Sequence, residues 1–170
     1  EAAQQTVDEF LTHVSESDLL NQPQMEPLRR QLLTRARAYY EEFVKQKTDD
    51  PKLKAKLGDA HLRLGNVLSD LGNQAAAIAE YLQMRAIFEQ LSKEHPDLPE
   101  YAGILASSYN NLGVLLRSTG KPDEALEVYA KAITIREQLS KKYPDVPEHA
   151  SGLASSYSNL GVLLNEMGKP

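Results

Sequence analysis

Hydrophobic and small residues recur along most of the chain at steps of three and four positions. Between positions 105 and 116 they fall at Leu105, Tyr109, Leu112, Gly113 and Leu116. That spacing places them on one face of an α-helix, whereas a half-buried strand would alternate at every second residue. The pattern predicts an all-α fold, with helices at about 25–47, 51–71, 74–94, 98–119, 122–142 and 146–167.

The pattern itself recurs every 48 residues. Residues 96–122 and 144–170 align without a gap and are identical at 19 of 27 positions. A weaker third copy lies upstream, where residues 62–73 align with residues 110–121. Self-similarity at a fixed period of this size is typical of stacked repeat proteins, in which each unit buries its apolar face against its neighbours.

The predicted helix boundaries carry capping signals. Asp97 with Glu100, and Asp145 with Glu148, have the spacing of a capping box, and Asp50 stands at a similar place upstream. We therefore predict that these aspartates cap the helices that follow them. The first helix of each copy is expected to end at a glycine, because glycine adopts the left-handed conformation most easily. These glycines are Gly72, Gly120 and Gly168.

Glycine also recurs inside the first helices, at Gly65, Gly113 and Gly161. A mid-helix glycine costs about 1 kcal/mol relative to alanine, so another interaction must offset that cost. Close approach of a neighbouring helix is the simplest one, and Tyr81 and Tyr129 in the second helices are expected to fill the space between helices. On this view Gly113→Val would overpack the contact.

The recurring residues resemble the pattern of a known repeat family. The pattern Tyr109-x-x-Leu112-Gly113-x-x-Leu116-x-x-x-Gly120-x-x-x-x-Ala125-x-x-x-Tyr129-x-x-Ala132 resembles the tetratricopeptide repeat. His61 and Met84 depart from it in the upstream copy, and the usual repeat is shorter, at about 34 residues. Long repeats with Asn-Asn-Leu and Ile-Arg-Glu are also similar to those of kinesin light chains. The resemblance implies a right-handed α-solenoid of antiparallel helical hairpins.

The expected organisation is two repeats, at 51–97 and 98–145, followed by the first helix of a third at 146–170. Residues 1–50 are interpreted as a degenerate hairpin that caps the stack, with an apolar stripe at Val7, Phe10, Leu11 and Val14. Residues 7–43 also resemble the segment that precedes such repeats in membrane-anchored bacterial serine/threonine kinases. That resemblance implies a kinase domain before Glu1 and a place outside the cytoplasm for this region, which we interpret as a fragment of a longer protein.

One stripe of each first helix faces away from the predicted core, because residues three and four apart share a face. By resemblance, this stripe lines the concave groove of a tetratricopeptide stack and contacts bound peptides. Asparagine suits that role, since its amide both donates and accepts hydrogen bonds. The alternative is that these side chains are solvated or contact the next repeat. The candidate peptide-binding residues are Asn66, Asn110, Asn111, Val114, Arg117, Asn159 and Asn165.

Lysine is absent from the matched groove positions, which argues against a lysine-rich clamp for C-terminal carboxylates. An internal peptide segment or a folded partner is therefore expected. The net charge of −5 argues against a nucleic-acid partner, including an RNA-reading helical repeat. The basic run Arg29, Arg30, Arg35 and Arg37 is flanked by glutamates and is interpreted as an ion-paired face.

Catalytic, metal and cofactor sites are not predicted. The chain has no cysteine, its four histidines show no ligand spacing, and no phosphate loop or nucleophile motif occurs. No apolar run approaches the roughly 20 residues of a membrane span, so direct membrane insertion is not expected.

The expected function is thus a non-catalytic scaffold that binds a protein or peptide partner in the groove. Two alternatives are a self-association module and a regulatory or sensor tail of a kinase. Self-association is expected through the last helix, because Tyr157, Leu160 and Leu164 keep an unmatched apolar face.

Overall fold

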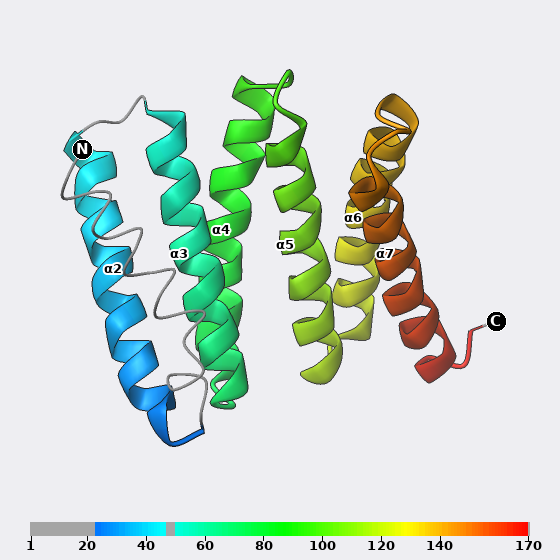
Figure 1. Cartoon of the computed structure of the whole chain (residues 1–170). Coiled ribbons are helices and arrows are strands. Elements are labelled where there is room, and N and C mark those ends of the chain that lie inside the picture. The colour runs from blue at the N-terminus through cyan, green and yellow to red at the C-terminus, as the bar shows by residue number, and fades with distance from the viewer. Residues whose placement is uncertain (1–22, 47–49, 170) are drawn as a thin grey trace. The chain divides into compact units, whose positions relative to one another are not determined.

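The computed structural model describes residues 23–46 and 50–169, and these residues form helices joined by short turns (Figure 1). No strand occurs in this described part, so the all-α prediction is confirmed. The predicted helix bounds agree with the observed ones to within one residue at each end. The elements are η1 (Pro23–Met25), α2 (Glu26–Gln46), α3 (Pro51–Asp70), α4 (Gln74–Glu94), α5 (Pro99–Ser118), α6 (Pro122–Lys142) and α7 (Pro147–Glu166). The apolar stripe predicted between Val7 and Val14 lies outside the described residues.

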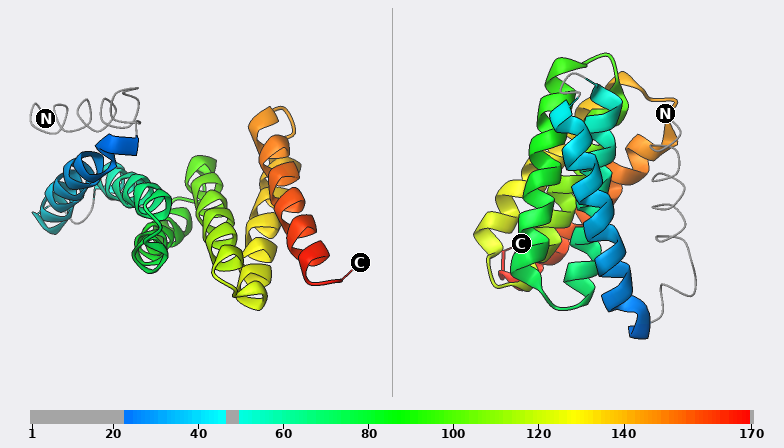
Figure 2. Two further views of the ribbon diagram at one scale, coloured as in Figure 1. Left: turned by 90° about the horizontal axis from the view of Figure 1, so that it is seen from below. Right: turned by 90° about the vertical axis from the view of Figure 1, so that its left-hand side faces the viewer.

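The chain divides into two compact units, with the boundary inside α4 between Met84 and Arg85. In unit 1, which ends at Met84, α2 packs against α3. In unit 2, which begins at Arg85, successive helices run in opposite directions and each of α5, α6 and α7 contacts the other two (Figure 2). Within each unit the arrangement is that of a tetratricopeptide-like solenoid.

The mid-helix glycines of α3 and α5 each accommodate a tyrosine ring from the next helix. A Cβ atom added at Gly113 would lie 2.5 Å from Cε1 of Tyr129, and one added at Gly65 would lie 2.7 Å from Cε1 of Tyr81. Both distances are too short for any side chain. Both tyrosines are buried, so the close approach predicted for these glycines is confirmed. At Gly161 in α7, no described atom lies within 4 Å of the added Cβ.

Three other glycines end the first helices as predicted. The backbone φ is +74° at Gly72 and Gly120 and +66° at Gly168, in the left-handed region. The amide of Asn73, just after Gly72, donates to the carbonyl of Leu68 at 2.8 Å, which satisfies a carbonyl that the helix itself leaves free. The chain can therefore reverse direction within a few residues and begin the second helix.

The N-terminal caps agree with the prediction at α3 only. Oδ1 of Asp50 accepts hydrogen bonds from the amides of Lys52 and Leu53 at 3.0 and 3.2 Å. This satisfies two of the amides that the first turn leaves without helical partners.

The caps predicted at Asp97 and Asp145 are wrong. Leu98 caps α5 and Val146 caps α7, and neither cap uses a side-chain hydrogen bond. The reason is the proline that opens each helix, because it fixes the cap at the residue directly before it. Asp50 directly precedes such a proline, whereas Asp97 and Asp145 stand one residue further upstream.

A polar triad with a buried histidine and glutamate joins the helices of unit 1. His61 of α3 is only 5% exposed, and its Nδ1 lies 2.6 Å from Oε2 of Glu80 on α4. Arg37 of α2 donates to the other carboxylate oxygen of Glu80. In the following copy, the positions equivalent to His61 and Glu80 hold Tyr109 and Val128, which are both buried. The burial of His61 follows from its place in the pattern, whereas the burial of Glu80 does not.

The glycine contacts generate a matched prediction. Gly113→Val is expected to lower the free energy of unfolding by about 1–3 kcal/mol, because the new side chain overlaps the Tyr129 ring. Gly161→Val places the same side chain in open space, so it is expected to be neutral or to stabilise by a few tenths of a kcal/mol. Urea denaturation followed by circular dichroism measures both. Equal destabilisation by the two substitutions would contradict the close-approach role of Gly113.

Candidate functional site

The candidate residues of α5 and α7 come together on one surface of unit 2. Nδ2 of Asn159 donates to Oδ1 of Asn110 at 3.1 Å, and Nη1 of Arg117 lies 3.5 Å from Oε1 of Glu166. Both interactions connect side chains on neighbouring first helices, so they join the stripes of two copies into one continuous surface. We call it the α5–α7 surface, and its residues are Asn110, Asn111, Val114 and Arg117 on α5 and Asn159, Val162 and Asn165 on α7.

Two valines face solvent on the α5–α7 surface. Val114 is 39% exposed and Val162 is 43% exposed, and the two occupy equivalent positions of their copies. Asn111 is half-buried and Asn165 is exposed, so amide groups flank the valines. The surface therefore offers apolar contacts within a frame of groups that donate and accept hydrogen bonds.

Asn66 belongs to unit 1 and has a partner within the chain. Its Oδ1 accepts a hydrogen bond from the hydroxyl of Tyr81 at 2.6 Å. Burial is the main cause that raises the pKa of Tyr81 to about 12, and the negative charge of Asp70 adds to it. The side chain of Asn66 thus satisfies the polar end of the ring that packs on Gly65. This pairing was not predicted from the sequence.

The following copy lacks the equivalent hydrogen bond. Val114 stands where Asn66 stands in the earlier copy, and the buried hydroxyl of Tyr129 finds no acceptor in the described part of the chain. Burial also raises the pKa of Tyr129, while nearby Arg117 lowers it and Glu166 raises it. Replacing asparagine by valine therefore leaves a polar atom unsatisfied and exposes an apolar side chain on the surface above it.

Tyrosine–glutamate hydrogen bonds link each first helix of unit 2 to the second helix before it. The hydroxyl of Tyr109 donates to Glu89, and the hydroxyl of Tyr157 donates to Glu137. Burial and then the bond to Glu89 raise the pKa of Tyr109 to about 12. Sequence reasoning missed these pairs, although the recurrence of both partners at the 48-residue spacing was a signal that could have found them.

The basic run on α2 is paired with acidic residues in part. Arg29 lies 3.5 Å from Glu26, and Nε of Arg37 lies 3.4 Å from Glu41, as expected for an ion-paired face.

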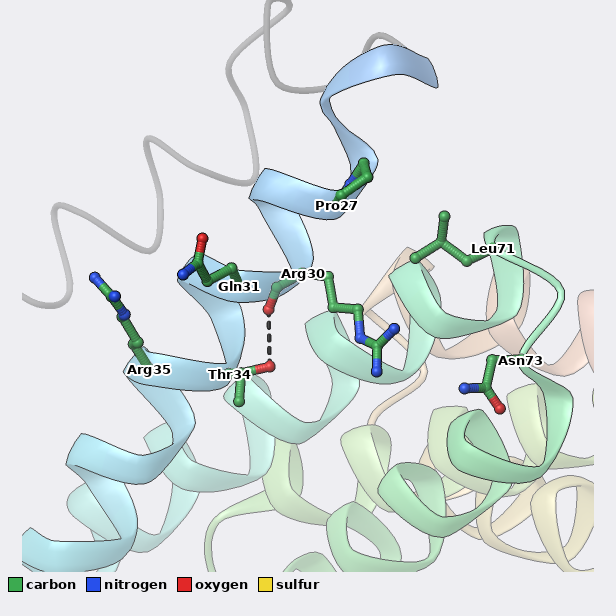
Figure 3. Close-up of a pocket in the computed structure, with 7 residues that line it drawn as sticks. All are labelled: Pro27, Arg30, Gln31, Thr34, Arg35, Leu71 and Asn73. Carbon is green, nitrogen blue, oxygen red and sulfur yellow. Dashed lines mark hydrogen bonds between the residues drawn. The ribbon is translucent and has the colours of Figure 1, made fainter.

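A cavity of about 760 Å³ lies beside this run, between α2 and the turn that follows α3 (Figure 3). Arg30 extends from α2 toward Leu71 and Asn73, while Arg35 extends to the other side (Figure 3). Oγ1 of Thr34 donates to the carbonyl of Arg30 at 2.8 Å, and both residues belong to the helical wall of the cavity. None of the candidate peptide-binding residues lines it.

The described residues hold neither a metal-binding cluster nor a membrane-spanning helix. Within 23–46 and 50–169, no group of three or more histidine, aspartate or glutamate side chains is arranged to hold a metal ion. None of the helices in those ranges combines the length and the apolar character needed to cross a bilayer.

The asparagine-to-valine difference between the copies predicts opposite effects of the same substitution. Tyr81→Phe removes the bond to Asn66 and is expected to lower the free energy of unfolding by about 0.5–1.5 kcal/mol. Tyr129→Phe removes a hydroxyl without an acceptor, so it is expected to be neutral or stabilising. Thermal and urea denaturation of the two variants measure the difference. A larger loss for Tyr129→Phe than for Tyr81→Phe would overturn this account.

Two segments of the chain are similar to known protein families. Residues 105–150 match one family model described as a tetratricopeptide repeat, and residues 58–83 match a second model with the same description. The matched segments contain the Gly113–Tyr129 and Gly65–Tyr81 contacts. Tetratricopeptide repeats generally mediate protein–protein interactions and are generally non-catalytic.

Comparison with solved structures supports the fold. The crystal structure of BtubC (BKLC) from P. vanneervenii is similar over 98% of this chain, with a TM-score of 0.60 and 23% sequence identity. This chain spans 66% of the length of that one. No curated protein matches the sequence significantly. The matches leave the resemblance to kinase-associated repeats as a prediction. Together with the geometry they show an all-helical, tetratricopeptide-like fold, in which residues 58–83 and 105–150 are similar to tetratricopeptide repeats.

Proposed function

We propose that this chain is a non-catalytic interaction module, and that the α5–α7 surface binds a peptide or protein partner. The observation that carries the proposal is the exposure of Val114 and Val162 at equivalent positions of adjacent first helices. A surface of this kind excludes water from the valines when a partner covers them, which favours binding. Its amide groups then fix the position of the partner's backbone.

The cross-helix interactions support a surface that is ordered before the partner arrives. Asn110 is bound to Asn159, and Arg117 is paired with Glu166. Side chains that are already held lose less conformational freedom on binding, so less of the interaction energy is lost to ordering them. Asn111 and Asn165 make no such bond to any of the described residues, and we assign them the direct contacts with the partner. The absence of lysine from the surface favours an internal segment of the partner over its C-terminal carboxylate.

Asn66 has a place in the same proposal. Its bond to Tyr81 uses the carbonyl oxygen, and this leaves the amide NH₂ group as a donor on an exposed residue. In unit 1 we therefore assign Asn66 a single donated bond to a partner's carbonyl oxygen.

A second proposed role is self-association through the opposite face of α7. In α5 the equivalent face is buried beneath α6, whereas Tyr157 of α7 is 46% exposed and Gly161 has open space above it. Leu160 and Leu164 on the same face are half-buried. A second copy of this chain would cover these apolar groups, and such patches commonly mark interaction sites.

Regulation of an attached kinase is a third role, which the sequence resemblance alone suggests. It requires that the gene encodes a kinase domain before Glu1, and sequencing the gene upstream of this region tests that requirement directly.

Substitutions on the α5–α7 surface test the main proposal. A random-peptide display library is panned on the immobilised chain, and the selected peptides are titrated by fluorescence anisotropy. Val114→Glu combined with Val162→Glu is expected to weaken binding about tenfold or more, because it places charges where the partner covers apolar groups. Val146→Glu is the matched control, since Val146 is similarly exposed but lies before α7 and outside the surface. Equal loss in both variants, or peptides that bind the double variant unchanged, would refute the proposal.

Sedimentation velocity tests the second role. The chain is expected to form dimers as its concentration rises, and Gly161→Arg is expected to keep it monomeric by occupying the open space on α7. A monomer at every concentration, or dimers that are indifferent to Gly161→Arg, would exclude that face.

A further inference from the structure

Unit 2 holds a partly buried guanidinium group, that of Arg136, which forms no ion pair with a carboxylate of the described residues. Nη2 of Arg136, on α6, donates to Oγ of Ser107 on α5 at 3.0 Å. That hydroxyl donates in turn to the carbonyl of Gly103 at 3.1 Å, so its oxygen is free to accept from the arginine. Over the described ranges, no aspartate or glutamate forms an ion pair with Arg136.

The electrostatic balance at Arg136 is unfavourable in the chain alone. Its Nε atom is buried and has no hydrogen-bond partner among the described residues. Burial lowers the pKa of Arg136, although the guanidinium stays protonated because arginine titrates far above neutral pH. Partial removal of a cation from water is costly, and a counter-charge nearby offsets that cost. An anion at this position would supply the counter-charge that Arg136 lacks among the described residues.

The backbone around Arg136 leaves room for that group. A Cβ atom at Gly152 of α7 would lie 2.2 Å from Nη1 of Arg136, so only glycine lets the guanidinium lie against α7 there. Nothing in the described chain lies within 4 Å of a Cβ added at Gly103. The two glycines and Ser107 border a cavity of about 250 Å³ between α5, α6 and α7.

Comparison of the copies shows that this polar cavity is a local departure from the repeat. The positions equivalent to Arg136 and His149 are Phe88 and Tyr101, 48 residues earlier. Phe88 is fully buried, and its ring centroid lies 6.2 Å from that of Tyr101. One copy thus packs two aromatic rings where the next places a guanidinium and an imidazole at the cavity.

The rim of the cavity constrains the kind of anion. Glu100 and Glu148, in the first turns of α5 and α7, line the cavity and are exposed. Their charges disfavour a multiply charged anion such as phosphate, and they favour a ligand that carries positive charge next to its anionic group. A carboxylate flanked by a lysine or arginine side chain meets both conditions.

The cavity also adjoins the α5–α7 surface. Ser107 lies one turn before Asn110 and Asn111 on α5, and residues at this spacing share a helix face. A peptide on the surface can therefore place one side chain in the cavity. We propose that this cavity receives the carboxylate of an aspartate or glutamate side chain of the bound peptide, next to a basic residue, and that Arg136 pairs with it while Ser107 holds the guanidinium in place. This inference rests on the proposed function of the surface.

An anion titration tests the pairing without any peptide. The Nε–H resonance of Arg136 is followed by ¹⁵N NMR while sodium acetate is added at constant ionic strength. A saturating shift is expected with acetate, a smaller one with phosphate and none with chloride. An unresponsive resonance would overturn the proposal. A response that appears only in Glu100→Gln/Glu148→Gln would also overturn it, because a rim glutamate would then occupy Arg136.

The displayed peptides test the ligand class. Peptides selected on the wild-type chain are expected to share an aspartate or glutamate next to a basic residue. Arg136→Gln is expected to weaken their binding about tenfold, and to have no effect on versions in which that acid is replaced by its amide. Arg136→Phe with His149→Tyr, which restores the aromatic pair of the earlier copy, is expected to abolish the acidic preference and keep the helical fold.

The two proposals fail in different ways. Peptides that need Val114 and Val162 but show no acidic preference, or that bind Arg136→Gln equally well, would refute the cavity and leave the surface intact. Selected peptides that need neither the valines of the α5–α7 surface nor Arg136 would refute both the proposed surface and the proposed cavity.

Discussion

The contact between a mid-helix glycine and the tyrosine ring of the next helix is the constraint on which each hairpin depends. Gly113 and Gly65 leave space that Tyr129 and Tyr81 fill, and any side chain at either glycine would overlap the ring. The contact brings the two backbones close together, and short turns with a left-handed glycine allow the chain to return. Because the period is 48 residues, the same face of α3 and of α5 packs against the next helix, and the opposite face of α5 is the one that we propose binds a partner.

The unusual polar and exposed apolar groups of this chain lie at positions where its sequence departs from the repeat. Many residues that the copies share are packed, such as Leu64 and Leu112. Where the copies differ, polar and apolar groups exchange places: Val114 replaces an asparagine and becomes exposed, and Arg136 replaces a buried phenylalanine and borders a cavity. Each exchange weakens local packing or leaves a polar atom unsatisfied, as at Tyr129. Such a cost is expected where a repeat protein adapts a common scaffold to a partner.

Local signals were sufficient to predict the helices, the glycines that end them and the buried faces, because periodicity and glycine conformation act within a few residues. The predicted cap at Asp97 was wrong for an equally local reason, because the proline that opens the helix places the cap one residue later, at Leu98. The side-chain partners were harder to predict. The bond of Asn66 to Tyr81 and the burial of Glu80 depend on which groups meet across helices, and a single helical pattern does not contain that information. Likewise, the helical pattern of the sequence did not indicate the hydrogen bond between Asn110 and Asn159 of the next copy.

A double-mutant cycle between Gly113 and Tyr129 tests the central claim most directly. Free energies of unfolding are measured in urea for Gly113→Ala, Tyr129→Ala and the double variant. The account predicts that Gly113→Ala destabilises the chain when the ring is present and stabilises it, by up to about 1 kcal/mol, when the ring is absent. The same effect of Gly113→Ala in both backgrounds would show that the two residues act independently. It would contradict the claim that the contact between Gly113 and the Tyr129 ring holds the hairpin together.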